Sequence, residues 1–263
     1  MVDASGPGAN VATLEWDVVE DRLSTLLRTL GDMHPEACCA GAAGAEAPVP
    51  RARLQEFLTR KFPSSRTRVV HDSLLVLAAA GRDTGIALIA GTGTVAYARA
   101  ADGREARRGG WGWMLGDEGG GVWITREAAR LVMARSEGGS DLGELGAALL
   151  AASGAENPEQ LLAELHERHE AMEWAALAAA VFDTADADPG SGDIIRRAGA
   201  ELAQLVEPLR DLCPDGPVVL AGGLLLNQSR LEAQVRKQVP MQCVRLEEPP
   251  VEGAVRIAGG LLA

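Results

Sequence analysis

The sequence predicts an α/β fold. Within residues 1–80, segments with the hydrophobic period of a helix alternate with short apolar runs typical of strands. The 263 residues are 47% hydrophobic and 24% charged, a composition typical of globular proteins. Only 3% are aromatic, so we expect a core of Ala, Leu and Val, with 31 glycines supplying tight backbone positions.

Five elements are expected in the first part of the chain. Residues 15–30 place apolar side chains on one stripe with charges opposite, which predicts an amphipathic helix. Residues 37–45 are small and apolar, as in a buried strand that runs into a glycine turn. Residues 51–62 and 73–80 predict helices, and residues 67–70 predict a strand between them. The stripe consists of Val18, Val19, Leu23, Leu26 and Leu27.

The rest of the chain begins with strands and continues with helices. Residues 85–90 and 95–100 predict strands, and Asp102 and Gly103 predict a hairpin turn after them. Residues 122–212 are helical in pattern, with glycine interruptions. The last expected elements are a strand at 218–220, a helix at 224–235, a strand at 243–246 and a helix from Gly253.

Acidic residues outnumber basic ones, 37 to 25, which gives a formal net charge of -12. Because a negative surface repels phosphate backbones, nucleic acid and anionic membranes are excluded as partners. No segment approaches the roughly 18 apolar residues of a membrane span, and the first residues lack a secretory signal, so we expect a cytoplasmic protein. The four cysteines form no CxxC pair, and no metal-ligand set is predicted.

A Gly-Thr-Gly-Thr turn at residues 91–94 joins two predicted strands. A dinucleotide-binding turn of similar spacing requires a helix to follow, whereas a strand follows here. Glycine still lets the backbone approach an anion, and threonine hydroxyls and N–H groups donate to it, so the turn suits a phosphate. A plain hairpin turn is the alternative.

The densest glycine segment is GGWGWMLGDEGGG at residues 109–121. Such a backbone can wrap a small ligand, and a tryptophan can cover the apolar face of a sugar ring. Asp117 and Glu118 are neighbours that point to opposite sides of an extended segment, so they are not a glycosidase pair. One of them is expected to hydrogen-bond sugar hydroxyls. The alternative is a glycine-rich loop with structural tryptophans.

Two further segments have a candidate functional residue or turn directly after a predicted strand. Asp72 ends a strand and begins a helix, where it could accept a proton from a hydroxyl that attacks a phosphoryl group. The alternative is a helix N-cap, which Asp favours. Gly222 and Gly223 form a strand-to-helix turn that would let a nucleotide approach the backbone and the N-terminus of the helix.

Together, Asp72, the GTGT turn, GGWGWMLGDEGGG and LAGGLLLN (220–227) resemble the N-acetylglucosamine kinase family, grouped with the BadF/BadG/BcrA/BcrD ATPases of the sugar kinase and actin superfamily. The resemblance implies two ribonuclease-H-like α/β lobes, with ATP and sugar meeting in the cleft between them. The small lobe would comprise residues 1–84 completed by 253–263, and the large lobe residues 85–252. It also implies ATP and Mg²⁺ as cofactors, phosphorylation of an amino sugar at its 6-hydroxyl, and compatibility with a homodimer.

The resemblance implies a role for each motif. Asp72 would be the general base. Gly91 to Thr94 would form a phosphate loop, and Gly222 and Gly223 the adenosine motif. The sugar-binding residues would be Asn10, Thr92, Gly93, Gly110, Trp111, Asp117 and Gly121.

One departure concerns the start of the chain. Family members open with a hairpin that carries a DGGGT-like phosphate loop, whose Asp helps to hold Mg²⁺, and MVDASGPGAN has no match for it. Either translation starts upstream of Met1, or the small lobe is truncated, exposes an unpaired strand edge and loses most kinase activity. The alternative function is therefore a non-catalytic sugar-binding or regulatory relative.

Overall fold

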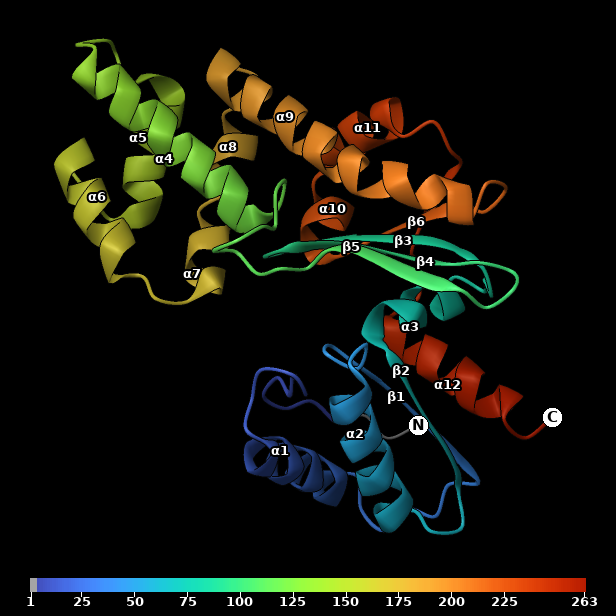
Figure 1. The fold of residues 1–263 in the computed structure, drawn as a ribbon. Helices are drawn as coiled ribbons and strands as arrows, with labels where there is room; N and C mark the ends of the chain where they lie inside the picture. Colours follow the sequence, from blue (N-terminus) through green and yellow to red (C-terminus); the bar gives the residue numbers. More distant parts are fainter. Residues whose placement is uncertain (1–3) are drawn as a thin grey trace. The chain divides into compact units, whose positions relative to one another are not determined.

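A computed structural model describes residues 4–263, which form two compact units (Figure 1). The first unit comprises the described residues up to Asp83 together with Leu246–Ala263, and the second is Thr84–Arg245. The chain therefore returns to the first unit at Leu246, whereas the sequence suggested Gly253. The last strand of the second unit ends at Arg245, which places the boundary there.

In the described part of the first unit, two parallel strands pair from Ala37 opposite Arg66 to Ala42 opposite His71. Two helices begin three residues before their predicted starts, at Pro48 and Pro250, because proline is favoured in the first turn of a helix. The elements are α1 (Trp16–Thr29), β1 (Ala37–Ala42), α2 (Pro48–Lys61), β2 (Arg66–His71), α3 (Asp72–Ala79) and α12 (Pro250–Gly260).

Helix α12 packs closely on α3, although the two are far apart in sequence (Figure 1). A Cβ atom at Gly253 would collide with the backbone of Leu75 and lie 2.8 Å from the nitrogen of Ala79, so the contact requires glycine. On α1 the predicted stripe is wrong for Val18, which is 40% exposed, while its neighbour Val19 is fully buried. Adjacent helical positions point about 100° apart, so both cannot face one core.

The second unit is built on a mixed sheet. Its strands are β3 (Gly85–Ala90), β4 (Thr94–Arg99), β5 (Glu105–Gly109), β6 (Val218–Ala221) and β7 (Cys243–Arg245). Among the described residues they lie in the order β5-β4-β3-β6-β7, with β3 antiparallel to β4 and parallel to β6. The strands expected from the sequence are confirmed. Strand β5 was not predicted. It follows the predicted turn at Asp102 and Gly103 and completes that hairpin by pairing with β4.

Helices cover this sheet, and α9 packs across β3, β4 and β5 (Figure 1). The core between them is built almost wholly of Ala, Val, Leu and Ile side chains, as the low aromatic content predicts. The helix expected at 224–235 is divided at Gln228. The helices are α4 (Gly121–Glu137), α5 (Gly143–Ser153), α6 (Pro158–Glu167), α7 (Ala171–Ala176), α8 (Ala179–Asp183), α9 (Pro189–Val206), the 3-10 helix η1 (Glu207–Leu212), α10 (Gly223–Asn227) and α11 (Ser229–Gln238).

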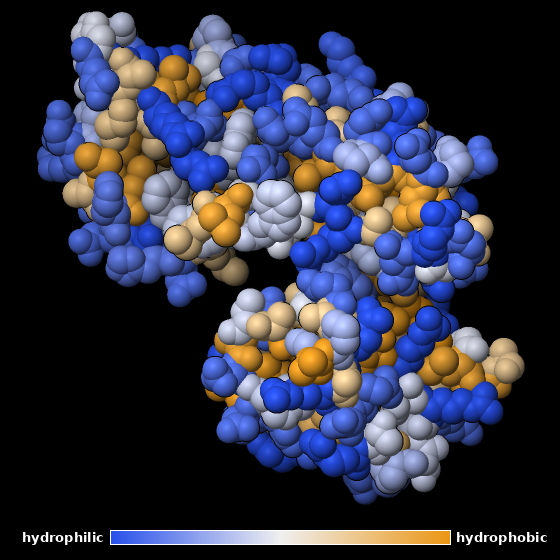
Figure 2. All heavy atoms as spheres, viewed as in Figure 1, coloured by the Kyte–Doolittle hydropathy of each residue, from blue (hydrophilic) through white to orange (hydrophobic). Residues whose placement is uncertain are grey.

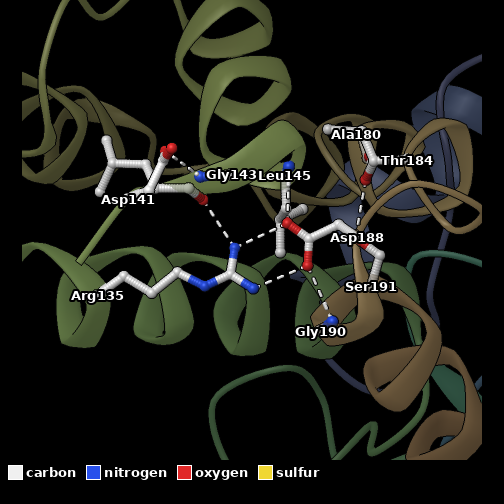
Figure 3. A network of polar contacts seen from close by, with 10 residues as sticks. Arg135, Asp141, Gly143, Leu145, Ala180, Thr184, Asp188, Gly190 and Ser191 are labelled. Atoms are coloured by element: carbon white, nitrogen blue, oxygen red, sulfur yellow. Dashed lines mark hydrogen bonds and ion pairs between the residues drawn. The ribbon is translucent and has the colours of Figure 1, made fainter.

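A buried ion pair joins three of these helices (Figure 3). Arg135 on α4 donates to both carboxylate oxygens of Asp188, at 2.7 and 2.8 Å. Asp188, only 3% exposed, also accepts from the N–H groups of Gly190 at the start of α9 and Leu145 on α5. The Arg135 guanidinium holds the pKa of the Asp188 carboxyl well below its usual range.

The visible face of the molecule is mostly hydrophilic (Figure 2). Among the described residues, no helix combines the length and the apolar character needed to cross a membrane.

Candidate functional site

Two loops of the second unit are hydrogen-bonded to each other. The GTGT turn follows β3, and the glycine-rich segment links β5 to α4. The N–H of Gly121 donates to Gly91 O at 2.9 Å, and that of Gly110 donates to Thr94 O at 2.8 Å. The hydroxyl of Thr94 donates to Glu118 O at 3.2 Å. The structure thus brings the predicted phosphate turn and the predicted sugar segment together.

Asp117 lies at the centre of this junction. Its Oδ1 accepts the N–H of Thr94 at 3.2 Å, and its carboxylate fills the space in front of the Gly93 α-carbon. Asp117 is 8% exposed and has a φ of 61°, a left-handed conformation that is costly for most residues and tolerated best by Asn and Asp. Burial raises the pKa of its carboxyl, opposed by the Thr94 N–H.

The tryptophans of the glycine-rich segment have different surroundings. Trp111 is 68% exposed and lies beside Gly116, where a Cβ atom would sit 3.3 Å from the Trp111 Cβ. Trp113 is partly buried, and its ring packs against that of Trp174 with 6.2 Å between centroids. An exposed indole such as Trp111 can cover a sugar ring, whereas Trp113 is engaged by the protein.

The Gly222–Gly223 turn lies at the same edge of the sheet. Strands β3 and β6 are parallel neighbours with Ile89 opposite Ala221, so the segments that follow them emerge side by side. Gly222 has a φ of 92°, and a Cβ atom there would collide with the backbone of Ala90. Glycine is therefore required for the turn to lie against the end of β3, and α10 begins directly after it.

Asp72 belongs to the first unit and is the first residue of α3. The N-cap alternative is wrong in detail, because His71 is the cap, its Nδ1 accepting from Ser73 N at 3.2 Å. The Asp72 Oδ1 also accepts from Ser73 N, at 2.7 Å, and lies 3.1 Å from His71 Nδ1. No donor among the described residues reaches its Oδ2. The side chain is 47% exposed, so this oxygen can accept a proton from a ligand.

Asn10 is also in the first unit. Its Oδ1 accepts the N–H groups of Ala12 at 2.9 Å and Thr13 at 3.2 Å, which closes a local turn. Asn10 and Asp72 both line a cavity of about 690 Å³, whose other walls are mainly apolar side chains of α1 and α2 and the strand β1.

Two residues that hold the site were not singled out from the sequence. Trp174 on α7 supports Trp113, and the buried hydroxyl of Thr125 on α4 donates to Trp174 O at 2.7 Å. The available signal was a single tryptophan in the segment AMEWAA (171–176), half of whose residues are alanines. Among the described residues, no three His, Cys, Asp or Glu side chains form a cluster that could hold a metal ion by themselves.

The architecture is that of actin-like ATPases and sugar kinases, which confirms the α/β, ribonuclease-H-like prediction. Residues 8–258 match the BadF/BadG/BcrA/BcrD ATPase family, and the chain belongs to that family. The resemblance found in the sequence is therefore confirmed.

Similar proteins carry sugar kinase names. The chain is 33% identical over 119 residues to the N-acetylmuramic acid/N-acetylglucosamine kinase of Clostridium acetobutylicum, a match that covers 44% of this chain and 39% of that protein. Crystal structures of candidate N-acetylglucosamine kinases are also similar. The structure from Chromobacterium violaceum has a TM-score of 0.71 and 25% identity, and the match covers 95% of this chain and 87% of the other. The structure from Porphyromonas gingivalis has a TM-score of 0.77 and 20% identity, and the match covers 97% of this chain and 90% of the other.

Proposed function

We propose that this chain carries out ATP-dependent phosphorylation of an amino sugar, N-acetylglucosamine or glucosamine, at its 6-hydroxyl in the cytoplasm. The observation that carries the proposal is the meeting of three glycine turns, at residues 91–94, 117–121 and 222–223, at one edge of the β3–β6 sheet. In open α/β sheets, ligands bind at this edge. Membership of an ATPase family and the names of the similar proteins support the same reaction.

The sugar would be held by residues of the glycine-rich junction. Asp117 Oδ1 accepts from Thr94 N–H, and its Oδ2, which lies against Gly93, would be the oxygen that accepts from a sugar hydroxyl. The exposed Trp111 would cover the ring. The remaining sugar-binding residues in the proposal are Asn10, Thr92, Gly93, Gly110 and Gly121.

ATP would bind at two turns of the same unit. Gly91 to Thr94 would hold the phosphates through N–H groups and hydroxyls, and Gly222 and Gly223 would lie against the adenosine. A Cβ at Gly91 would meet nothing within 4 Å, and one at Gly223 only the tip of Asn227, so both faces are open to a ligand. Mg²⁺ would enter with the ATP phosphates, where it needs only one or two protein carboxylates and neutralises phosphate charge.

We assign Asp72 the role of general base. Its Oδ2 would take the proton of the sugar 6-hydroxyl while the hydroxyl oxygen forms a bond to the γ-phosphorus and ADP leaves with the electrons of the broken bond. The neighbouring contacts of Asp72 all involve Oδ1, so they fix the carboxylate without engaging Oδ2.

A coupled ADP-release assay with N-acetylglucosamine, glucosamine and related sugars tests the proposal. The assay includes a form of the chain extended upstream. Sugar-dependent ADP release is expected, and no turnover by either form would overturn the enzyme assignment. Calorimetry separates the alternative, because sugar binding with no dependence on ATP or Mg²⁺ indicates a non-catalytic sugar-binding protein.

A further inference from the structure

Residues 110–115 form the most exposed part of the glycine-rich segment. Both ends of the segment are fixed by backbone hydrogen bonds, Gly110 N to Thr94 O and Gly121 N to Gly91 O. Between these ends the side chains of Trp111, Met114 and Leu115 are 68%, 77% and 78% exposed. Trp113 is the one residue of 110–115 that is partly buried. The position of this stretch therefore depends on what holds Trp113.

Trp113 is held by helices α7 and α4. The rings of Trp113 and Trp174 are tilted by 34° with 6.2 Å between centroids, a separation within the range of interacting aromatic pairs. Arg126 Nη1 on α4 lies 3.4 Å from Trp113 O and adds a weak hydrogen bond. The ring of Trp174 is thus the aromatic partner of Trp113, the partly buried residue of this stretch.

Helix α7 is short, yet its position is fixed from several sides. A capping box between Glu170 and Glu173 closes its N-terminus. The indole N–H of Trp174 donates to Arg168 O at 3.1 Å, and its carbonyl accepts from Thr125. A Cβ atom at Gly121 would lie 2.8 Å from the Ala175 Cβ, so α7 also abuts the end of the glycine-rich segment. These contacts fix Trp174 in place, so it can act as a support for the Trp113 ring.

We propose that Trp174 is a positioning residue for sugar binding. Its ring holds Trp113, and through Trp113 it holds residues 110–115 where Trp111 can cover the sugar ring. The inference rests on the proposed function and adds that affinity for the sugar depends on a residue that does not touch it. Affinity for ATP, which the turns at 91–94 and 222–223 would bind, does not depend on this contact.

Three variants on α7 test the inference. Trp174→Leu removes the aromatic face, Trp174→Phe keeps an aromatic ring, and Met172→Ala changes a side chain of the same helix that is 74% exposed. The first measurement is the rate of chymotrypsin cleavage after Trp111, Met114 or Leu115, which reports loosening of the segment without requiring activity. The second is the calorimetric dissociation constant for N-acetylglucosamine, compared with KM for ATP.

Trp174→Leu is expected to raise both the cleavage rate and the sugar dissociation constant by about tenfold, the scale set by one lost aromatic contact. KM for ATP is expected to stay unchanged in Trp174→Leu. Trp174→Phe should keep most of the wild-type sugar affinity and resistance to cleavage, and Met172→Ala should behave as wild type. If Trp174→Leu does not fold, Trp113→Leu removes the same contact from the other side and must give the same result.

The inference would be overturned if Trp174→Leu had the same cleavage rate and the same affinity for the sugar as the wild type. It would also be overturned if the variant lost affinity for the sugar and for ATP to the same extent. Failure of the proposed function would be seen differently, because the wild-type protein itself would then bind no amino sugar.

Discussion

The carboxylate of Asp117 lies directly against the α-carbon of Gly93 and accepts a hydrogen bond from the N–H of Thr94. This contact joins the turn at 91–94 to the glycine-rich segment and leaves no space for a side chain at Gly93. It accounts for the glycine at that position without reference to any ligand.

Gly93→Ala is expected to lower the free energy of unfolding by about 1–3 kcal/mol, because the new methyl group displaces a buried carboxylate. Gly91→Ala is the matched control, since a Cβ atom there meets nothing within 4 Å and stability should change by no more than about 0.5 kcal/mol. Chemical denaturation measures both. Equal stability of the two variants would show that the Asp117 contact does not constrain the turn.

Asp117→Asn is expected to keep or increase stability at neutral pH while weakening sugar binding about tenfold or more. Asn tolerates the left-handed φ of 61° and can still accept from Thr94, but it lacks the buried charge. Asp117→Ala, by contrast, should be destabilised. Thermal unfolding and calorimetry on the same samples check the two effects.

The pH dependence of Asp117 has a definite sign. Because burial raises its pKa in the folded state, the folded protein binds this proton more tightly than the unfolded chain does. Wild type therefore loses stability relative to Asp117→Asn as pH rises from below about 4 through the folded-state pKa. A relative gain of wild-type stability over that range would contradict the placement of Asp117.

Asp188→Asn is expected to cost about 3–5 kcal/mol at pH 7, because it leaves the largely buried Arg135 without its charged partner. The folded-state pKa of Asp188 is lowered by Arg135, so its stabilisation is present above the unfolded pKa of about 3.9 and is lost as pH falls below it. The difference between variant and wild type should shrink by pH 3 in denaturation experiments.

The control for that prediction is Asp193→Asn. Asp193 pairs with Arg196 and Arg197 on the surface, where its own side chain is 50% exposed and theirs are 60% and 38% exposed. Arg197 keeps its second partner, Glu127, so the loss of Asp193 should cost no more than about 1 kcal/mol. Equal losses at Asp188 and Asp193 would mean that the pair in Figure 3 does not stabilise the helices it joins.

Asp72→Asn is expected to lower kcat about 10²–10⁴-fold, with the sugar dissociation constant nearly unchanged. The amide keeps the shape of the carboxylate and an oxygen for Ser73 N–H, but it cannot accept the hydroxyl proton. Ser73→Ala, which removes only the weaker 3.3 Å contact to Asp72, is the comparison for structural disturbance. A retained rate in Asp72→Asn would reduce Asp72 to a residue that stabilises the start of α3.

The sequence predicted the regular elements well where hydrophobic periodicity was strong, as in β3, β4 and α1. The helix starts were placed three residues late, after Pro48 and Pro250, because the favourable position of proline in the first turn of a helix was not applied there. The glycine turns were found because glycine marks backbone that approaches other atoms closely. Which atoms fill that space, such as the Asp117 carboxylate at Gly93, depends on tertiary packing and was not predictable.

The support from Trp174 could not be found from the sequence for the same reason. Its partner Trp113 lies 61 residues earlier, and nothing in the local pattern of either segment indicates the pairing. The roles of Asp72 and Asn10 were inferred from the resemblance to a family and not from the pattern of the residues around them.

The most direct test of the account is the identity of the product formed from ATP, Mg²⁺ and N-acetylglucosamine. Two-dimensional ¹H–³¹P NMR of the reaction mixture would show which hydroxyl carries phosphate. We predict a phosphorus signal coupled to the protons on carbon 6, together with an equal amount of ADP, and none with Asp72→Asn. A phosphate on another carbon, or no phosphorylated sugar from this chain or its upstream-extended form, would contradict the account.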